Sequence, residues 1–494
     1  MAADINTPCA AYNDMAAHWN LIRDLMGGTL AMRKARMTWL PKEAEEHDLK
    51  YNARLDRSIL YNGLRDTVKR LKGKPFSKPV SLSEDLPERL MPMQWNIDGE
   101  GRSLSDFAGD LFYEMLQPGI GHVFVDYPRV TDANPSIERS LYPHLIYIPA
   151  EDMIWWNYEI ENGKKVLSEI RFRQTKTVPD GMYGEKSVDQ VRRYTRSEWQ
   201  VFEYSASAGD FIETDSGPHT FGAMRDSANN LVSNEDGETP GQAIPLVTFY
   251  ANRTGYMTAD PPLEDLAWLN LAHWQSFSDQ RNILKVARLP ILAGKGLSKE
   301  DVEKKTVIGP NMTLKSSSPD AQWSFVEHSG KAIEAGRQDL VDLEFRMEVL
   351  GLQPLMTRRS GQQTATGQRI DESRTESDIQ SWITSIEGGL ETCFEHAATW
   401  TGVELHPDFA VDIFQDFGIG YQASEEIKAL IMAREKRQIS HETFLREIRR
   451  RGLLSETVDI AAEIQAVADE QPPLGTIGDG GMDDGGEEPA TEGQ

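Results

Sequence analysis

Side chains suited to contacting phosphate groups gather in one short, polar stretch of the chain. This stretch, residues 353–369, contains no acidic residue and carries five basic or amide side chains: Arg358, Arg359, Gln362, Gln363 and Arg369. Guanidinium and amide groups donate hydrogen bonds to phosphate oxygens, which positions a protein on nucleic acid without reading the base sequence. The stretch is therefore a candidate DNA-contacting loop, although an ordinary flexible surface loop has the same composition.

A second basic cluster lies nearer the C-terminus, within residues 424–452. The segment predicts two short helices separated by a turn at Ser440, which is the pattern of a helix-turn-helix. One face of its second helix carries three basic side chains at i, i+3 and i+4: Arg446, Arg449 and Arg450. Acidic residues in the same segment dilute this charge, so an amphipathic helix with a basic solvent face explains the pattern as well.

No set of residues matches the spacing of a common catalytic or metal-binding motif. The chain contains no G-x-x-x-x-G-K-[ST], no H-E-x-x-H, no C-x-x-C and no G-x-S-x-G. Its ten histidines are scattered, and His396 is expected to be a structural residue of a helix. Two cysteines, Cys9 and Cys393, cannot supply a four-ligand zinc site. We therefore expect no enzymatic activity, no P-loop motor, no metal and no cofactor.

The 494 residues carry 52 basic and 78 acidic side chains, a formal net charge of −26. This acidity argues against a protein that coats nucleic acid with its whole surface, because such binding needs Lys and Arg to neutralise phosphates. It is compatible with an acidic wall past which DNA slides and which a few basic loops touch. Acidity that only maintains solubility is an equally open explanation.

The sequence also indicates where the protein is made. No run of about 18 apolar residues predicts a membrane-spanning helix. The first twenty residues lack the positive segment and apolar block of a secretory signal. Two cysteines suit a reducing compartment. We expect a soluble protein that is intracellular when made.

The first half of the chain is predicted to begin with helices and continue with strands. Apolar residues at steps of three and four predict helices over 10–26 and 51–72, and Ser103 begins another that ends near Leu116. The segment His122–Pro128 is predicted to be a strand. Residues 144–251 alternate as strands do, with an Asn-Gly pair at Asn162–Gly163 typical of a tight hairpin turn.

The second half is predicted to be mainly helical. Helices are expected over 263–289 and 331–350, separated by short strand-like and loop pieces, and the basic stretch follows. A long helix then ends at Gly402, a residue suited to a left-handed C-cap. Its second half carries apolar residues on one face: Ile379, Ile383, Ile386, Leu390, Phe394 and Ala397.

The order of these segments resembles the portal (head–tail connector) proteins of tailed bacteriophages. The resemblance extends over nearly the whole chain, and its order and spacing carry it rather than any single motif. Its residues are Trp19, Tyr51–Asn52, LKGKPF, HVFVDYP followed by HLIYIPAEDMIWW, IPLVTFYANR followed by PPLEDLAWLNLAHWQSFSDQRNILKVARLPIL, TATGQRIDESRTESDIQSWITSIEGGLE and REKRQISHETFLREIRRRG. The chain departs from the family pattern at Gly367 and at Arg437–Gln438.

The resemblance implies an α+β chain with a portal-type fold: an α/β wing, a two-helix stem, a small clip, a tunnel loop and a helical crown. The segments follow from the order along the chain. They are 1–262 wing, 263–289 first stem helix, 290–328 clip, 329–350 second stem helix, 351–369 tunnel loop, 370–420 long wing helix and return strand, 421–470 crown, and 471–494 a disordered acidic tail.

The resemblance also implies a function and a set of partners. A portal is a homo-oligomeric ring, usually of twelve copies, at one capsid vertex, through which double-stranded genomic DNA is packaged and ejected. Its partners are the terminase large subunit, then a head–tail adaptor protein, and the major capsid or scaffold protein. The protein would be found in the virion, and in the host cytoplasm during assembly, without contacting a membrane. The alternative is a DNA-binding protein that uses residues 424–452 as a helix-turn-helix.

Overall fold

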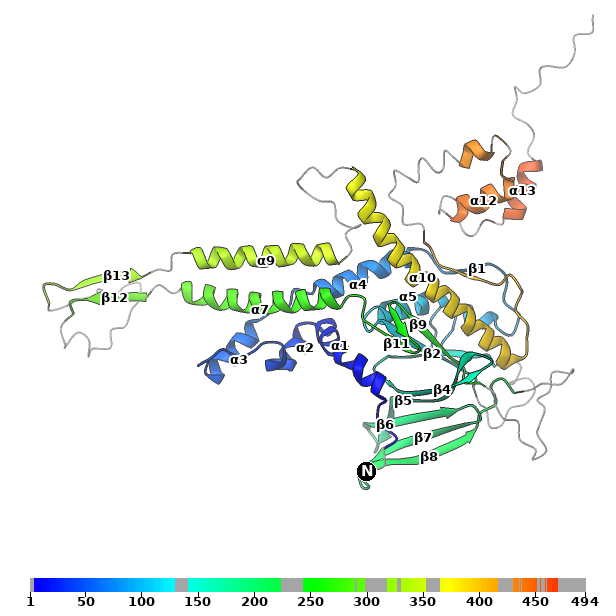
Figure 1. Ribbon diagram of the computed structural model, residues 1–494, viewed down its shortest axis with the longest axis horizontal. Helices are drawn as coiled ribbons and strands as arrows, with labels where there is room; N and C mark the ends of the chain where they lie inside the picture. The colour runs from blue at the N-terminus through cyan, green and yellow to red at the C-terminus, as the bar shows by residue number, and fades with distance from the viewer. Residues whose placement is uncertain are drawn as a thin grey trace, which may run out of the picture. The chain divides into compact units, whose positions relative to one another are not determined.

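The computed structural model describes most of the chain. The described residues are 4–128, 141–223, 243–288, 291–297, 318–326, 330–351, 365–415, 430–434, 436, 438–450, 454, 458 and 460–469. They divide into two units, Met1–Gln415 and Asp416–Gln494, which are described separately. The first unit combines helices with antiparallel sheets (Figure 1), which confirms the α+β expectation.

The chain begins with a layer of helices. They are α1 (Ala10–Met26), α2 (Gly28–Ala35), α3 (Asp48–Arg57), α4 (Gly63–Gly73) and α5 (Leu104–Met115). The single helix predicted over 51–72 is wrong, because Ser58 adopts an extended conformation that ends α3. Asn62 then begins α4: its side chain accepts the Arg65 N–H at 3.0 Å and donates to the Leu25 carbonyl at 2.6 Å.

A three-stranded sheet forms the centre of the first unit. Its order is β3 (His144–Ile148), β2 (Ile120–Asp126), β9 (Leu246–Tyr250), with both pairings antiparallel. The central strand β2 is buried along nearly its whole length, as a strand covered on both faces must be. Helix α5 contacts β2, and a long helix, α10 (Ala365–Thr401), contacts β2 and β9.

A five-stranded antiparallel meander continues from this sheet. Its strands are β4 (Met153–Glu161), β5 (Lys164–Asp180), β6 (Gly184–Thr195), β7 (Glu198–Ser205) and β8 (Asp210–Pro218). The turn at Asn162–Gly163 has positive φ at both residues, 49° and 77°, which confirms the predicted tight hairpin. The ring of Phe124 on β2 packs on Phe172 and Tyr194, so aromatic side chains join the two sheets.

A long helical hairpin leaves the sheets. It consists of α7 (Glu264–Ala287), strands β12 (Ile291–Lys295) and β13 (Gln322–Val326), and α9 (Lys331–Leu350). The two strands pair antiparallel from Ile291 opposite Val326 to Lys295 opposite Gln322. Figure 1 shows α7 and α9 side by side, with the strand pair beyond their far ends. We refer to α7, β12, β13 and α9 together as the helical hairpin.

The second unit contains two short helices in its described part. They are α12 (His441–Arg450) and α13 (Ile460–Asp469), and they contact each other. Ser440 begins α12 as predicted, since its hydroxyl accepts the Thr443 N–H at 3.0 Å. Across the described helices of both units, none has the length and apolar character needed to cross a membrane.

The burial of His122 generates a prediction about pH. Its Nδ1 lies 3.1 Å from the Thr248 hydroxyl of the neighbouring strand, and burial lowers the pKa of the imidazole to about 3. The unfolded chain takes up this proton near its ordinary pKa of 6.5. The stability that neutral His122 provides is therefore complete above about pH 6.5 and is lost as the pH falls below it.

We expect His122→Asn, which does not titrate, to have a flatter dependence of unfolding free energy on pH. The difference from the unmodified chain between about pH 6.5 and pH 5 should be about 2 kcal/mol, at about 1.4 kcal/mol for each pH unit. Urea unfolding at a series of pH values measures it. Equal slopes in the two proteins would show that His122 is protonated in the folded state.

Candidate functional site

Polar side chains join the two helices of the helical hairpin. His273 Nε2 lies 3.2 Å from Glu344 Oε1, and Ser276 donates a hydrogen bond to Asp339. One turn further along, Gln280 donates to the Ile333 carbonyl at 2.8 Å. Three contacts at successive turns fix which residue of α7 faces which residue of α9. A purely apolar interface would specify that register less sharply.

A buried amide fixes the base of the helical hairpin. Asn270 on α7 is fully buried; its oxygen accepts the Leu64 N–H at 3.0 Å and its nitrogen donates to the Tyr61 carbonyl at 2.7 Å. The start of α4 is therefore bound to α7. Met347 of α9 is also buried and lies against Gly63, the first residue of α4. The three helices thus meet at one point.

The end of α9 also lies against α4. A Cβ atom added to Gly351 would come within 2.6 Å of the Thr67 hydroxyl, so the backbone approaches α4 closely there. The chain therefore leaves the helical hairpin beside α4 and enters residues 352–364. This places the first end of the basic stretch on a fixed structural element.

Helix α10 receives the chain at the other end of that stretch, and its second half is anchored on the sheets. The apolar residues predicted to share one face are all buried: Ile379, Ile383, Ile386, Leu390, Phe394 and Ala397. Beyond them, Trp400 donates to the Val125 carbonyl at 2.8 Å, and Arg89 donates to the Thr401 carbonyl at 2.9 Å. Gly402, at φ 66°, ends the helix as predicted.

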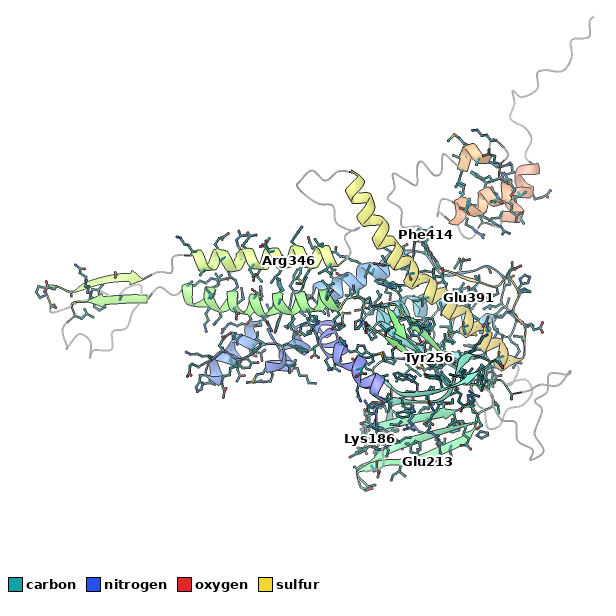
Figure 2. The ribbon with its side chains drawn as sticks, in the orientation of Figure 1. Lys186, Glu213, Tyr256, Arg346, Glu391 and Phe414 are labelled. Atoms are coloured by element: carbon teal, nitrogen blue, oxygen red, sulfur yellow. The ribbon has the colours of Figure 1, made fainter. Side chains whose placement is uncertain are left out.

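Two carboxylates on α10 bind a returning strand. Glu387 accepts the Ile413 N–H at 2.8 Å, and Glu391, labelled in Figure 2, accepts the Val411 N–H at 3.1 Å. Strand β14 (Val411–Asp412) is held in this way and pairs with β1 (Ser81–Leu82). Burial raises the pKa of Glu387, while the Ile413 N–H opposes that shift.

The electrostatic character of the helical hairpin is acidic. Its two helices carry eight acidic residues against five basic ones, whereas residues 353–369 carry three basic residues and no acidic one. Burial lowers the pKa of His273, and its contact with Glu344 works against that shift. The hairpin is thus a surface that repels phosphate groups, and it is followed in the chain by a segment that attracts them.

The sequence-predicted contact residues lie largely outside the described part of the chain. Arg358, Arg359, Gln362 and Gln363 fall within residues 352–364, which the structure does not describe. The backbone of Arg369 lies on α10, which begins at Ala365. Its assignment to a loop is therefore wrong, because the helix starts earlier than the polar composition suggested.

The alternative basic cluster is partly paired within its own helix. Arg446 forms an ion pair with Glu442, one turn earlier, at 2.8 Å. The helix predicted before Ser440 is described only over 430–434 and at a few residues after it. The described part of this segment therefore offers less positive charge for DNA than its arginines alone suggested.

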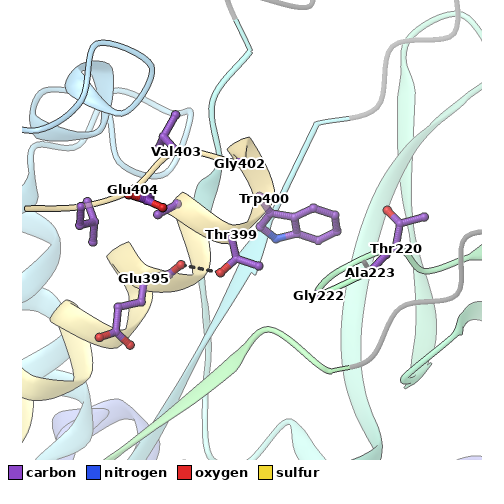
Figure 3. Close-up of a pocket in the computed structure, with 11 residues that line it drawn as sticks. Thr220, Gly222, Ala223, Glu395, Thr399, Trp400, Gly402, Val403 and Glu404 are labelled. Atoms are coloured by element: carbon purple, nitrogen blue, oxygen red, sulfur yellow. Dashed lines mark hydrogen bonds between the residues drawn. The ribbon is translucent and has the colours of Figure 1, made fainter. Parts of the chain in front are cut away.

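A cavity of about 450 Å³ lies where α10 ends against the segment after β8 (Figure 3). Thr399 there donates to the Glu395 carbonyl at 2.9 Å, and the indole of Trp400 also lines the cavity. Among the described residues lining it, two are acidic and none is Lys or Arg, which does not suit a phosphate group. Within the described part of the chain, no three His, Cys, Asp or Glu side chains group as metal ligands would.

Some residues that position the site were not predicted from the sequence. Asn270, His273 and Gln280 lie at helical spacing on α7, so a polar stripe was present in a helix expected to be buried. The role of Gly389 was hidden in a Gly-Gly pair: a Cβ added there would come within 2.2 Å of the Phe249 ring on β9, while one added to Gly388 would meet nothing.

Comparison with known proteins gives one family match and several distant structural neighbours. Residues 262–401, from just before α7 to the end of α10, match a family described as a domain of unknown function (DUF4055). None of the curated proteins matches the chain.

The structural neighbours include chains of gene transfer agent (GTA) particles. One, from the virion of a native GTA particle, is 12% identical and covers 83% of this chain and 96% of its own, with a TM-score of 0.42. Another, from the neck of an empty GTA particle computed with C6 symmetry, is 12% identical and covers 76% and 87%, with a TM-score of 0.42.

A third, from the neck of a native GTA particle computed with C12 symmetry, is 11% identical and covers 84% and 91%, also with a TM-score of 0.42. These particle and neck structures agree with the resemblance of the sequence to head–tail connector proteins. Likenesses this distant do not establish what the chain does.

The two adjacent glycines of α10 provide a matched test of its anchoring. We expect Gly389→Ala to lower the unfolding free energy by about 1–3 kcal/mol, because the new methyl group overlaps the Phe249 ring. Gly388→Ala should be neutral or raise it by up to about 1 kcal/mol, because Ala favours a helix and meets no atom there. Chemical unfolding measures both. Equal effects of the two substitutions would contradict the close approach of α10 to β9.

Proposed function

We propose that the chain is a portal-type protein: a non-enzymatic structural component that forms a ring at one vertex of a tailed-phage capsid. The observation that carries the proposal is the helical hairpin, two antiparallel helices with a strand pair at their far end. From its base the chain continues through a basic segment into a long anchored helix. This is the order of stem, clip, stem, tunnel loop and wing helix that the sequence resemblance leads us to expect.

The proposed parts correspond to observed elements. The stem helices are α7 and α9, the clip contains β12 and β13, and the wing contains the N-terminal helices with both larger sheets. Residues 351–364 and the first turn of α10 provide the tunnel loop, and α12 and α13 belong to the crown. Supporting this division, the helical hairpin joins the sheets only through its base, where Asn270 and Met347 meet α4.

The charge distribution suits a passage for DNA. Acidic helices repel the phosphates of a duplex and keep it from adhering, while Arg358, Arg359 and Arg369 provide a small number of contacts that do not depend on sequence. In this function the ring conducts double-stranded DNA during packaging and ejection. The clip would bind the terminase large subunit first and a head–tail adaptor protein later, and the wing would face the capsid or scaffold protein in the virion.

Electron microscopy of the purified protein tests the ring directly. We expect closed rings, with twelve copies as the expected number, because the proposed channel exists only in an assembly. Native mass spectrometry gives the copy number. A protein that stays monomeric at every concentration and salt condition tried would contradict the proposal.

The basic residues of the loop can be tested in particles. We expect the Arg358→Ala, Arg359→Ala double variant to form normal rings but to yield particles with less DNA protected from nuclease, because two phosphate contacts in the channel are lost. The DNA content per particle is the measurement.

The matched control removes two positive charges elsewhere. Lys176 and Lys186 are exposed on β5 and β6, in the sheet that the proposal places in the wing, so Lys176→Ala, Lys186→Ala should leave DNA content unchanged. Full DNA content in the double-arginine variant would contradict a DNA-facing role for Arg358 and Arg359. An equal loss in both variants would point to net charge rather than position.

A further inference from the structure

Helix α9 is apolar on two opposite faces. One face packs inward through Leu343 and Met347, which are buried. On the other side Val341, Phe345 and Val349, at i, i+4 and i+8, leave 44%, 50% and 46% of their surface exposed. A helix exposed on one side ordinarily carries polar residues there, so an apolar stripe on that side indicates contact with a partner. We call these three residues the α9 stripe.

A second exposed apolar patch lies on the helices at the N-terminal end of the chain. Leu30 on α2, Met37 just after it and Leu49 on α3 are among the most exposed large apolar residues that the structure describes. We call these three residues the α2–α3 patch. Helix α7 contacts both α9 and α3, and Figure 1 shows it between them. The stripe and the patch therefore belong to helices on either side of α7.

The charges around these two surfaces are complementary. Glu334, Asp342 and Glu348 share the exposed side of α9 with the stripe. Lys34 and Lys50, both exposed, lie beside the α2–α3 patch. Two α9 stripes facing each other would bring like charges together, which costs free energy in a protein of net charge −26. A stripe facing a patch brings opposite charges together instead.

We infer that the α9 stripe of one copy packs on the α2–α3 patch of the next copy. The inference rests on the proposed function, because it names the surface through which the ring closes. A contact between two different surfaces leaves one of each free on every pair of copies. Further copies can then add in the same direction until a ring closes, whereas a contact between identical surfaces would stop at a dimer.

Cysteine cross-linking of the full-length chain tests this contact. Cys9 is half-buried and Cys393 is buried, so Cys9→Ser gives a background with little thiol reactivity. In that background the Leu30→Cys, Val341→Cys double variant should give, with a short bismaleimide, a ladder of covalent oligomers up to the ring. A mixture of the two single variants should give covalent dimers only, because each copy then holds one reactive thiol.

The matched control moves one thiol away from the contact. Met182 is highly exposed at the turn between β5 and β6, so the Met182→Cys, Val341→Cys variant has the same number of accessible thiols. We expect at least about tenfold less cross-linked product from it, since an interface holds its two thiols at a high effective concentration.

The failure of this inference can be told apart from the failure of the ring itself. Rings seen by electron microscopy without a ladder from the Leu30→Cys, Val341→Cys variant would overturn the contact and leave the ring standing. Dimers from Val341→Cys alone would overturn it in favour of a contact between identical stripes. A chain that neither forms rings nor cross-links would overturn both the contact and the proposed function.

Discussion

The arrangement of the helical hairpin depends on one buried amide. Asn270 has no exposed surface, so its oxygen and nitrogen must both find partners inside the protein. They find them in the backbone of Leu64 and Tyr61, where the chain turns into α4. Only one placement of α7 against α4 satisfies both groups. Met347 brings α9 to the same point, so the direction in which the helical hairpin leaves the sheets is fixed there.

Two rigid elements hold the ends of the basic stretch independently. At one end Gly351 lies against Thr67 of α4, and at the other α10 is anchored by its buried face and by Glu387 and Glu391. The stretch itself needs no packing of its own to stay in place, because its attachment points are fixed by a core on each side. Polar and basic residues, which cannot form a core, are therefore tolerated there without loss of the fold.

Sequence periodicity predicted α1, α5, α7 and α9 well, because each has an apolar face that must be buried. The same signal failed over 51–72, since apolar residues keep helical spacing across a break that Ser58 and Asn62 create. The start of α10 was misplaced because a polar helix end has no apolar face to reveal it. The contacts of Asn270 and His273 could not be predicted, since their partners lie on other helices and only the fold brings them together.

The helical hairpin divides its interactions in an unusual way. Contacts between α7 and α9 are largely polar and specify register, whereas apolar surface remains on the outer side of α9. Fully burying a Val or Phe side chain stabilises by about 1.5–3 kcal/mol, so half-exposed side chains retain roughly 1 kcal/mol each for a later contact. The single chain thus sets the geometry of the hairpin through hydrogen bonds and keeps part of its hydrophobic stabilisation for assembly. A ring built in this way gains strength with each added copy, while the acidic surface opposes the contacts that would not lead to closure.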